Sequence, residues 1–187
     1  MARPLNEDKR RAILDSAVRI IASQGLGATT ALIAKEAGIS TGSLFTYFPD
    51  KVTLFNQLYL HIKTDVADAL LQAFPLQADI KEKAFHVWQS YTVWACNQPE
   101  RRAALQQLSA SRIITEDTRQ QSMSMFDSVN QVLSELGKSD LCQNVGFITA
   151  IMASLAETTV DFAVKEPEKA EEYTLNGFRA FWRTLGM

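Results

Sequence analysis

The residues best able to carry covalent or metal chemistry are few in this sequence and lie far apart. The chain of 187 residues holds two histidines, His61 and His86, and two cysteines, Cys96 and Cys142. No Cys-x-x-Cys pair, cysteine–histidine cluster or glycine-rich phosphate loop occurs, although hydrolytic and metal centres depend on such groupings. We therefore expect no enzyme activity, no metal and no cofactor. Both cysteines fall in apolar stretches, where a buried, reduced thiol is the expected form.

A second group of side chains is suited to binding an organic ligand. Trp88, Tyr91 and Trp94 recur at helical spacing, and their rings offer stacking faces. Met123 and Phe126 are adaptable apolar residues that could border the same cavity. These five residues predict a pocket for a small, largely apolar or aromatic ligand. The alternative for each of them is that it fills the core.

The elements that must position these residues are helices. Apolar residues make up 47% of the chain and charged residues 21%, which suffices for a core and excludes a disordered chain. Helical periodicity recurs along the whole length and predicts an all-α fold of about nine helices, including one over 79–97 and one over 115–136. The longest uncharged run, 141–156, is short and polar for a membrane span. The polar N-terminus does not resemble a signal peptide, so we expect a cytoplasmic protein without a membrane partner.

The first fifty residues show the pattern of a helix-turn-helix. A helix capped by Asn6 is expected to end at Gln24, and a short second helix to run from Thr29–Thr30 to a turn at Gly38. Ser40 then caps a third helix over 41–48, and Asp50 caps a fourth that begins at Lys51. Two short helices joined by a glycine-containing turn form a helix-turn-helix. An ordinary helical hairpin is the alternative.

The stretch TTALIAKEAGISTGSLFTYFPDKVTLF makes the assignment more specific, because it resembles the DNA-binding head of the TetR family of transcriptional regulators. The resemblance covers roughly residues 9–58. It implies a DNA-binding domain over 1–50 and a ligand-binding and dimerisation domain over 51–187, with a helix over 51–73 bridging them. It also implies a homodimeric repressor that binds a palindromic DNA operator and is released by a small-molecule effector.

The family pattern, carried over by position, assigns nine residues to DNA contacts. They are Thr29, Thr30, Thr41, Gly42, Ser43, Phe45, Thr46, Tyr47 and Lys51. In this arrangement Gly42 lets the backbone approach DNA, Phe45 touches a thymine methyl group, and Tyr47 contacts phosphate. The third helix contains no Arg, Lys, Asn or Gln, which are the residues that make bidentate base contacts. We therefore expect recognition through hydroxyls, methyl groups and DNA shape, with Arg3 adding a minor-groove contact.

The family also pairs its last two helices with their copies in a dimer. The residues suited to that interface here are Gly146, Ala150, Ser154, Phe178 and Trp182. Packing within one chain is the alternative for each of them.

Two other functions fit the same pattern. A helical small-molecule-binding protein or enzyme would carry such a head without acting on DNA, and an activator would share the fold of a repressor. Charge favours DNA binding only slightly, because residues 1–51 carry seven basic and five acidic side chains.

Overall fold

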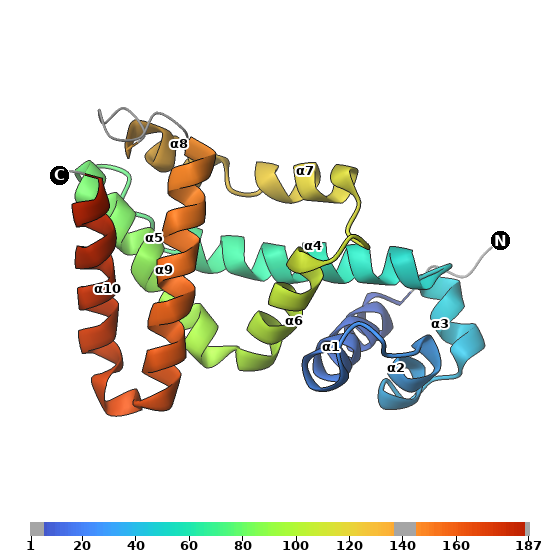
Figure 1. Cartoon of the computed structure of the whole chain (residues 1–187). Helices are drawn as coiled ribbons and strands as arrows, with labels where there is room; N and C mark the ends of the chain where they lie inside the picture. Colours follow the sequence, from blue (N-terminus) through green and yellow to red (C-terminus); the bar gives the residue numbers. More distant parts are fainter. Residues whose placement is uncertain (1–5, 137–144, 186–187) are drawn as a thin grey trace. The chain divides into compact units, whose positions relative to one another are not determined.

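The computed structural model describes residues 6–136 and 145–185, and all regular secondary structure in these ranges is helical (Figure 1). This confirms the predicted all-α fold. The helices are α1 (Glu7–Gln24), α2 (Thr30–Glu36), α3 (Thr41–Tyr47), α4 (Lys51–Leu71), α5 (Ile80–Asn97), α6 (Pro99–Ala110), α7 (Glu116–Ser124), α8 (Asp127–Leu136), α9 (Val145–Lys165) and α10 (Ala170–Thr184), with a 3-10 turn η1 (Pro167–Lys169) before α10. The predicted contact of Arg3 lies outside the described residues.

The prediction of one long helix over 115–136 is wrong, because α7 ends at Ser124 and α8 begins at Asp127, with Met125 and Phe126 between them. Neither glycine nor proline marks this break, so periodicity alone indicated a continuous helix. Pro167 begins the short turn η1, which precedes α10.

The chain divides into two compact units. Unit 1 comprises Met1–Asp65 and Gln98–Met125, and unit 2 comprises Val66–Asn97 and Phe126–Met187. Unit 1 thus contains α6 and α7 as well as the three N-terminal helices. The expected division into a DNA-binding part over 1–50 and a ligand-binding part over 51–187 concerns function and stays a prediction.

The core of unit 1 forms where the apolar faces of its first helices meet. Ile13 and Ile21 of α1, Ile33 of α2, Leu44 of α3 and Leu54 of α4 are each 0% exposed. Burying a side chain of this size contributes about 1.5–3 kcal/mol. Such a core fixes the short α2 and α3, which would not be stable helices alone.

Unit 2 depends on a close approach of α10 to α9 and α5 (Figure 1). Gly177 of α10 makes this possible, because a Cβ atom there would lie 2.2 Å from Thr159 Oγ1 and 2.8 Å from Trp88 Cζ2. Trp88 is 0% exposed, stacks on Phe181 at 6.0 Å between ring centroids, and donates its indole N–H to the Thr174 carbonyl at 2.9 Å. The aromatic core of this unit is therefore built around one glycine.

One described segment, Gly146–Lys165, is long and apolar enough to cross a membrane by length and composition alone. Within this chain 33% of that window is buried. A single such helix is weak evidence for a membrane span, since core helices of soluble proteins have the same character.

Candidate nucleic-acid interface

The helix-turn-helix of α2 and α3 is held by backbone geometry as well as by its core. Gly38 has φ +67°, a left-handed conformation that favours glycine. The following amide of Ile39 donates to the Ala34 carbonyl at 3.0 Å, and Ala34 is 1% exposed where α2 meets the rest of the unit. The predicted turn is thereby confirmed in its residues and in its conformation.

Side-chain caps begin each of the first four helices. Asn6 and Thr29 accept from the backbone amides of residues 9 and 32, at 3.1 and 3.2 Å. Ser40 accepts from the Ser43 amide at 3.1 Å, and Asp50 from the Thr53 amide at 2.7 Å. Hydrogen bonds from the backbone and the side chain of Thr53 lower the pKa of Asp50 below its ordinary value. The caps predicted at Asn6, Ser40 and Asp50 are confirmed.

One face of α3 is buried and the other is open. Leu44 and the following Phe48 are 0% and 1% exposed, whereas Phe45 is 42% exposed. The exposed residues predicted to face DNA are Gly42, Ser43, Phe45 and Thr46, while Thr41 and Tyr47 are half-buried. An added Cβ at Gly42 would meet only Ser40 Oγ, at 4.0 Å. Nothing within the described chain requires a glycine at this position.

The remaining predicted contacts flank α3. Thr29 is exposed and Thr30 half-buried at the start of α2. The Lys51 ammonium donates to the Leu26 carbonyl at 2.8 Å and lies 5.1 Å from the Phe55 ring centroid. An ammonium has three N–H donors, so this internal bond leaves donors for a phosphate.

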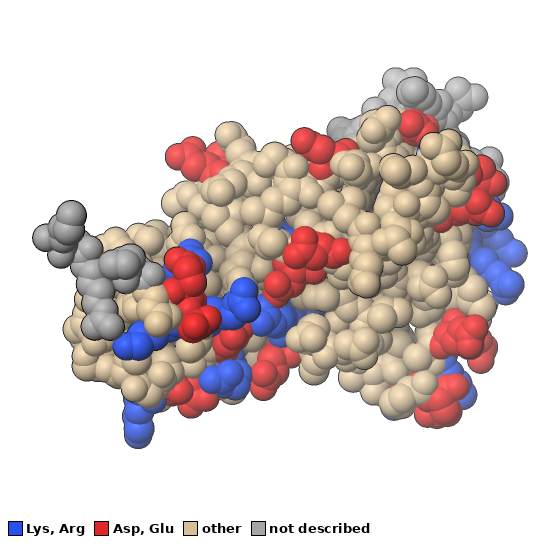
Figure 2. Space-filling view, turned by 180° about the vertical axis from the view of Figure 1, so that it is seen from behind, with Lys and Arg blue, Asp and Glu red and all other residues tan. Residues whose placement is uncertain are grey.

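Charged side chains of both signs occur on α1 and α2. Basic and acidic side chains are interspersed on the face drawn in Figure 2. Two basic residues of α1 are engaged internally, since Arg19 pairs with Glu36 at 2.9 Å and Arg10 donates to Gln57 Oε1 at 2.7 Å. These two guanidinium groups are thus tied within the chain.

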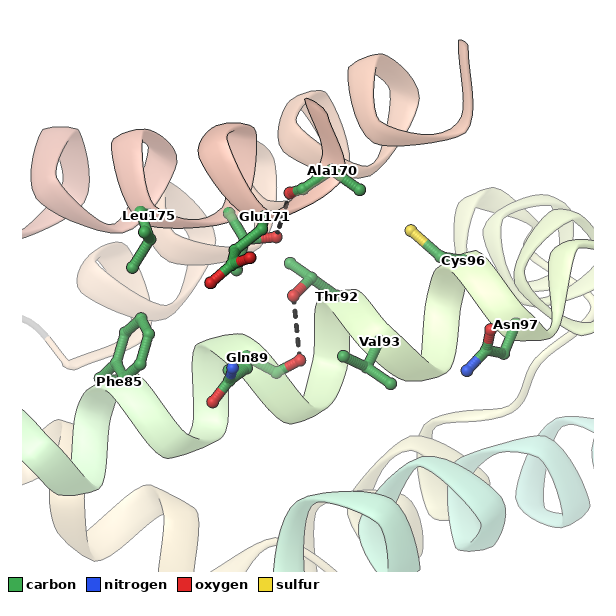
Figure 3. Close-up of a pocket in the computed structure, with 10 residues that line it drawn as sticks. Phe85, Gln89, Thr92, Val93, Cys96, Asn97, Ala170, Glu171 and Leu175 are labelled. Atoms are coloured by element: carbon green, nitrogen blue, oxygen red, sulfur yellow. Dashed lines mark hydrogen bonds between the residues drawn. The ribbon is translucent and has the colours of Figure 1, made fainter. Parts of the chain in front are cut away.

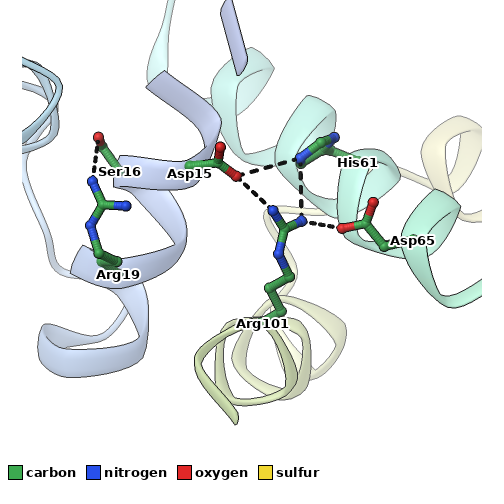
Figure 4. Close-up of polar contacts among 6 residues, drawn as sticks. All are labelled: Asp15, Ser16, Arg19, His61, Asp65 and Arg101. Carbon is green, nitrogen blue, oxygen red and sulfur yellow. Dashed lines mark hydrogen bonds and ion pairs between the residues drawn. The ribbon is translucent and has the colours of Figure 1, made fainter. Parts of the chain in front are cut away.

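A polar cluster within unit 1 joins α6 to α1 and α4 (Figure 4). Arg101 of α6 donates to Asp15 of α1 at 2.7 Å and to Asp65 of α4. His61 Nε2 lies 3.3 Å from an Arg101 nitrogen. Burial lowers the pKa of His61 below its ordinary value, although the Asp65 carboxylate opposes this effect. A neutral imidazole suits this position, because it can accept from the guanidinium.

Two amide side chains add further ties in unit 1 that the sequence pattern did not reveal. Asn56, 7% exposed, donates to the Ile113 carbonyl at 2.9 Å and accepts from the Thr115 amide at 2.9 Å. Gln107 of α6 donates to the Ile21 carbonyl at the end of α1, at 3.0 Å. The loop before α7 is thus fixed to α4, and α6 is fixed to α1.

The aromatic residues predicted to bind a ligand lie in different surroundings. Trp88 is a core residue, and Trp94 is 8% exposed. Tyr91 is half-buried, donates its hydroxyl to the Glu157 carboxylate, and lies 5.9 Å from the Trp94 ring centroid. Met123, in unit 1, is 63% exposed, and Phe126, in unit 2, is half-buried.

A pocket of about 270 Å³ lies instead between α5 and α10 (Figure 3). None of the five predicted ligand-binding residues lines it. Its walls are Phe85, Gln89, Thr92, Val93, Cys96, Asn97, Ala170, Glu171, Thr174 and Leu175. The helix over 79–97 is apolar on more than one side, because Phe85, Val93 and Cys96 lie away from the side that carries Trp88 and Trp94. This second apolar side is the sequence signal for the pocket.

The predicted dimer residues divide between surface and interior. Gly146, Ala150 and Ser154 are exposed along α9. Phe178 is 5% exposed and packs against the Phe85 ring at 5.0 Å, so its own chain covers it. Trp182 is half-buried next to Phe178.

Comparison with known proteins agrees with this architecture. Residues 13–58 match the family model "Bacterial regulatory proteins, tetR family". The chain is 38% identical over 76 residues to the HTH-type transcriptional regulator HbdR of Aromatoleum sp. (strain CIB), a match that covers 40% of this chain and 31% of that relative.

Solved structures extend the similarity to the whole chain. A protein from Shewanella sp. PV-4, assigned to the tetR family of transcription regulators, has 28% identity and a TM-score of 0.83 over 94% of this chain and 96% of its own. The regulator FadR of Bacillus subtilis, in complex with stearoyl-CoA, has 18% identity and a TM-score of 0.71 over 92% and 97%. Residues 13–58 thus match the tetR family of bacterial regulatory proteins, and the chain as a whole shares the fold of the solved regulator from Shewanella sp. PV-4.

Proposed function

We propose that this chain is a homodimeric, DNA-binding transcriptional repressor of the cytoplasm. The observation that carries the proposal is the open face of α3, where a glycine, two hydroxyls and an exposed phenylalanine stand on a helix fixed by its buried side. An α-helix of this kind fits the major groove, and a dimer reads two half-sites about 34–36 Å apart. In this arrangement Thr41, Tyr47 and Lys51, with Thr29 and Thr30, contact the phosphates and edges around the bases.

The dimer is proposed to form through the exposed faces of α9 and α10. Phe147 is 59% exposed and Phe162 46% exposed on α9, next to the small residues Gly146, Ala150 and Ser154. A large exposed apolar surface of this kind is typical of an interaction site. Pairing of two copies across it would also account for the apolar character of a helix that is one-third buried within the chain.

The release of DNA is proposed to follow the binding of a small apolar or aromatic ligand in unit 2. The pocket between α5 and α10 and the Tyr91–Trp94 pair both support such a ligand. The transcriptional regulator FadR of Bacillus subtilis, which shares this fold, was solved with stearoyl-CoA. A ligand shifts a population only by its differential affinity for two states, and a hundredfold release requires about 2.7 kcal/mol.

The experiment that tests DNA binding is selection of duplexes from a random pool by the purified protein, followed by affinity measurements on the selected sequence. Thr46→Ala should lower affinity for the selected duplex more than affinity for unrelated DNA. Thr64→Ala is a matched control, because both threonines are exposed and donate to the carbonyl four residues earlier, at 3.2 and 3.0 Å. Absence of any selected duplex at low salt would favour a ligand-binding protein or enzyme without a DNA role.

A further inference from the structure

Two hydroxyl groups on the exposed face of α3 are held in opposite hydrogen-bonding states by their own helix. Ser40 Oγ accepts the Ser43 amide N–H at 3.1 Å and donates to Ser43 Oγ at 3.0 Å. Thr46 Oγ1 donates to the Gly42 carbonyl at 3.2 Å. A hydroxyl has one proton to donate and two lone pairs that accept. The internal bonds therefore decide what each hydroxyl can still offer.

The Ser43 oxygen already accepts one hydrogen bond, which leaves its own proton and one lone pair to point away from the protein. In the part of the chain that the structure describes, no acceptor is assigned to this proton. Accepting a bond also polarises a hydroxyl and strengthens its next donation. Ser43 is thereby prepared to act as a donor.

The Thr46 hydroxyl is in the opposite state. Its proton is committed to the Gly42 carbonyl within the helix, which leaves the oxygen lone pairs and the methyl group exposed. Thr46 is thereby prepared to accept a hydrogen bond. Residues 43 and 46 are three apart on one helix, about 4.5 Å along its axis, so both can address the same or neighbouring base pairs.

We propose that Ser43 and Thr46 form a donor–acceptor pair that reads base edges: Ser43 donates to a purine N7, a guanine O6 or a thymine O4, and Thr46 accepts from the exocyclic amino group of adenine or cytosine. The groups named are those that the major groove displays. The inference rests on the proposed DNA-binding function and adds the polarity of each contact. It gives a helix without Arg, Lys, Asn or Gln a way to distinguish bases.

The test uses the full-length protein, the duplex obtained by selection, and base analogues that delete one hydrogen-bonding group at a time. The 7-deazapurines remove the N7 acceptor, 2-aminopurine in place of guanine removes O6, and 2-pyrimidinones remove thymine O4 or the cytosine amino group. Purine in place of adenine removes its amino group. Affinities are measured for the wild type, Ser43→Ala and Thr46→Val, which keeps the branched shape of threonine. Circular dichroism and thermal unfolding establish that each variant is folded.

We expect one acceptor deletion to weaken the wild type by about threefold to tenfold, the worth of one hydrogen bond, and to leave Ser43→Ala unaffected. One amino deletion should do the same for the wild type and leave Thr46→Val unaffected. Ser40→Asp keeps an oxygen for the Ser43 amide but cannot donate to its hydroxyl. In this variant the Ser43 hydroxyl should donate to the new carboxylate instead of to DNA. The acceptor deletion that weakens the wild type should therefore leave Ser40→Asp unaffected.

The opposite pairing, with Thr46→Val insensitive to an acceptor deletion, would overturn the proposal. Equal sensitivity of the wild type and both variants to every analogue would overturn it as well. Both outcomes require a selected duplex and so leave DNA binding intact. Failure to select any duplex refutes the proposed function itself and is distinguishable on that ground.

Discussion

Replacing Gly42 by alanine should separate the stability of this protein from its binding to DNA. The added methyl group has Ser40 Oγ at 4.0 Å as its nearest heavy atom beyond the adjoining residues and the helix's own backbone, which is ordinary contact or open space. Gly42 is also the second residue of α3, and alanine is favoured over glycine within helices by up to about 1 kcal/mol. We expect the free energy of unfolding to stay the same or rise by up to that amount. For a chain of this size, the corresponding rise in Tm is at most about 2–4 °C.

Binding should respond in the opposite direction. If the backbone of α3 approaches the base edges at Gly42, a methyl group there overpacks the interface, at a cost of about 1–3 kcal/mol. Such a cost corresponds to a loss of affinity of roughly 5-fold to 150-fold. Urea unfolding followed by circular dichroism measures the first quantity, and fluorescence anisotropy with a labelled, selected duplex measures the second.

Gly27→Ala is the matched control, since an alanine Cβ there has no neighbour within 4 Å and the residue lies outside α3. It should leave both stability and affinity nearly unchanged. A stable Gly42→Ala variant with the affinity of the wild type would refute close approach of α3 to DNA. Unfolding of that variant would refute the open space around Gly42.

Three further predictions concern the two units. Gly177→Ala places a methyl group 2.2 Å from Thr159 Oγ1 and should destabilise the chain by about 1–3 kcal/mol; an unchanged unfolding midpoint would contradict the close packing of α10. The lowered pKa of His61 means that the folded state binds fewer protons than the unfolded state near the ordinary value of 6.5. Stability should therefore fall as pH drops below that value, and His61→Gln should show a smaller fall between pH 7 and pH 5; an equal fall would assign the effect to other groups. Ala150→Glu on the exposed face of α9 should convert a dimer to a monomer in analytical ultracentrifugation, and a persistent dimer would place the interface elsewhere.

Local chemistry made the helix-turn-helix predictable from the sequence. Caps such as Ser40 and the left-handed Gly38 act within a few residues, so their positions follow from residue type and spacing. The buried Leu44 and exposed Phe45 likewise follow from the helical period. The resemblance of this region to one family then assigned the open face of α3 to DNA.

Contacts between distant segments were not predictable in this way. Arg101 meets Asp15 across 86 residues of sequence, and nothing local in either helix marks the other as a partner. Gly177 is required by the side chains it meets, and these become visible only once α10 is placed. A tryptophan ring can stack on a ligand or fill the core equally well, so residue type alone did not decide the role of Trp88. The structure places Trp88 in the core.

The most direct test of the central claim, that α3 is the DNA-reading surface, is hydrogen exchange of the backbone amides with and without the selected duplex. We expect slower exchange in peptides covering residues 41–47 and the start of α2 when DNA is bound, together with little change in peptides from the pocket between α5 and α10. Protection confined to other segments, with residues 41–47 exchanging at the same rate in both states, would contradict the account.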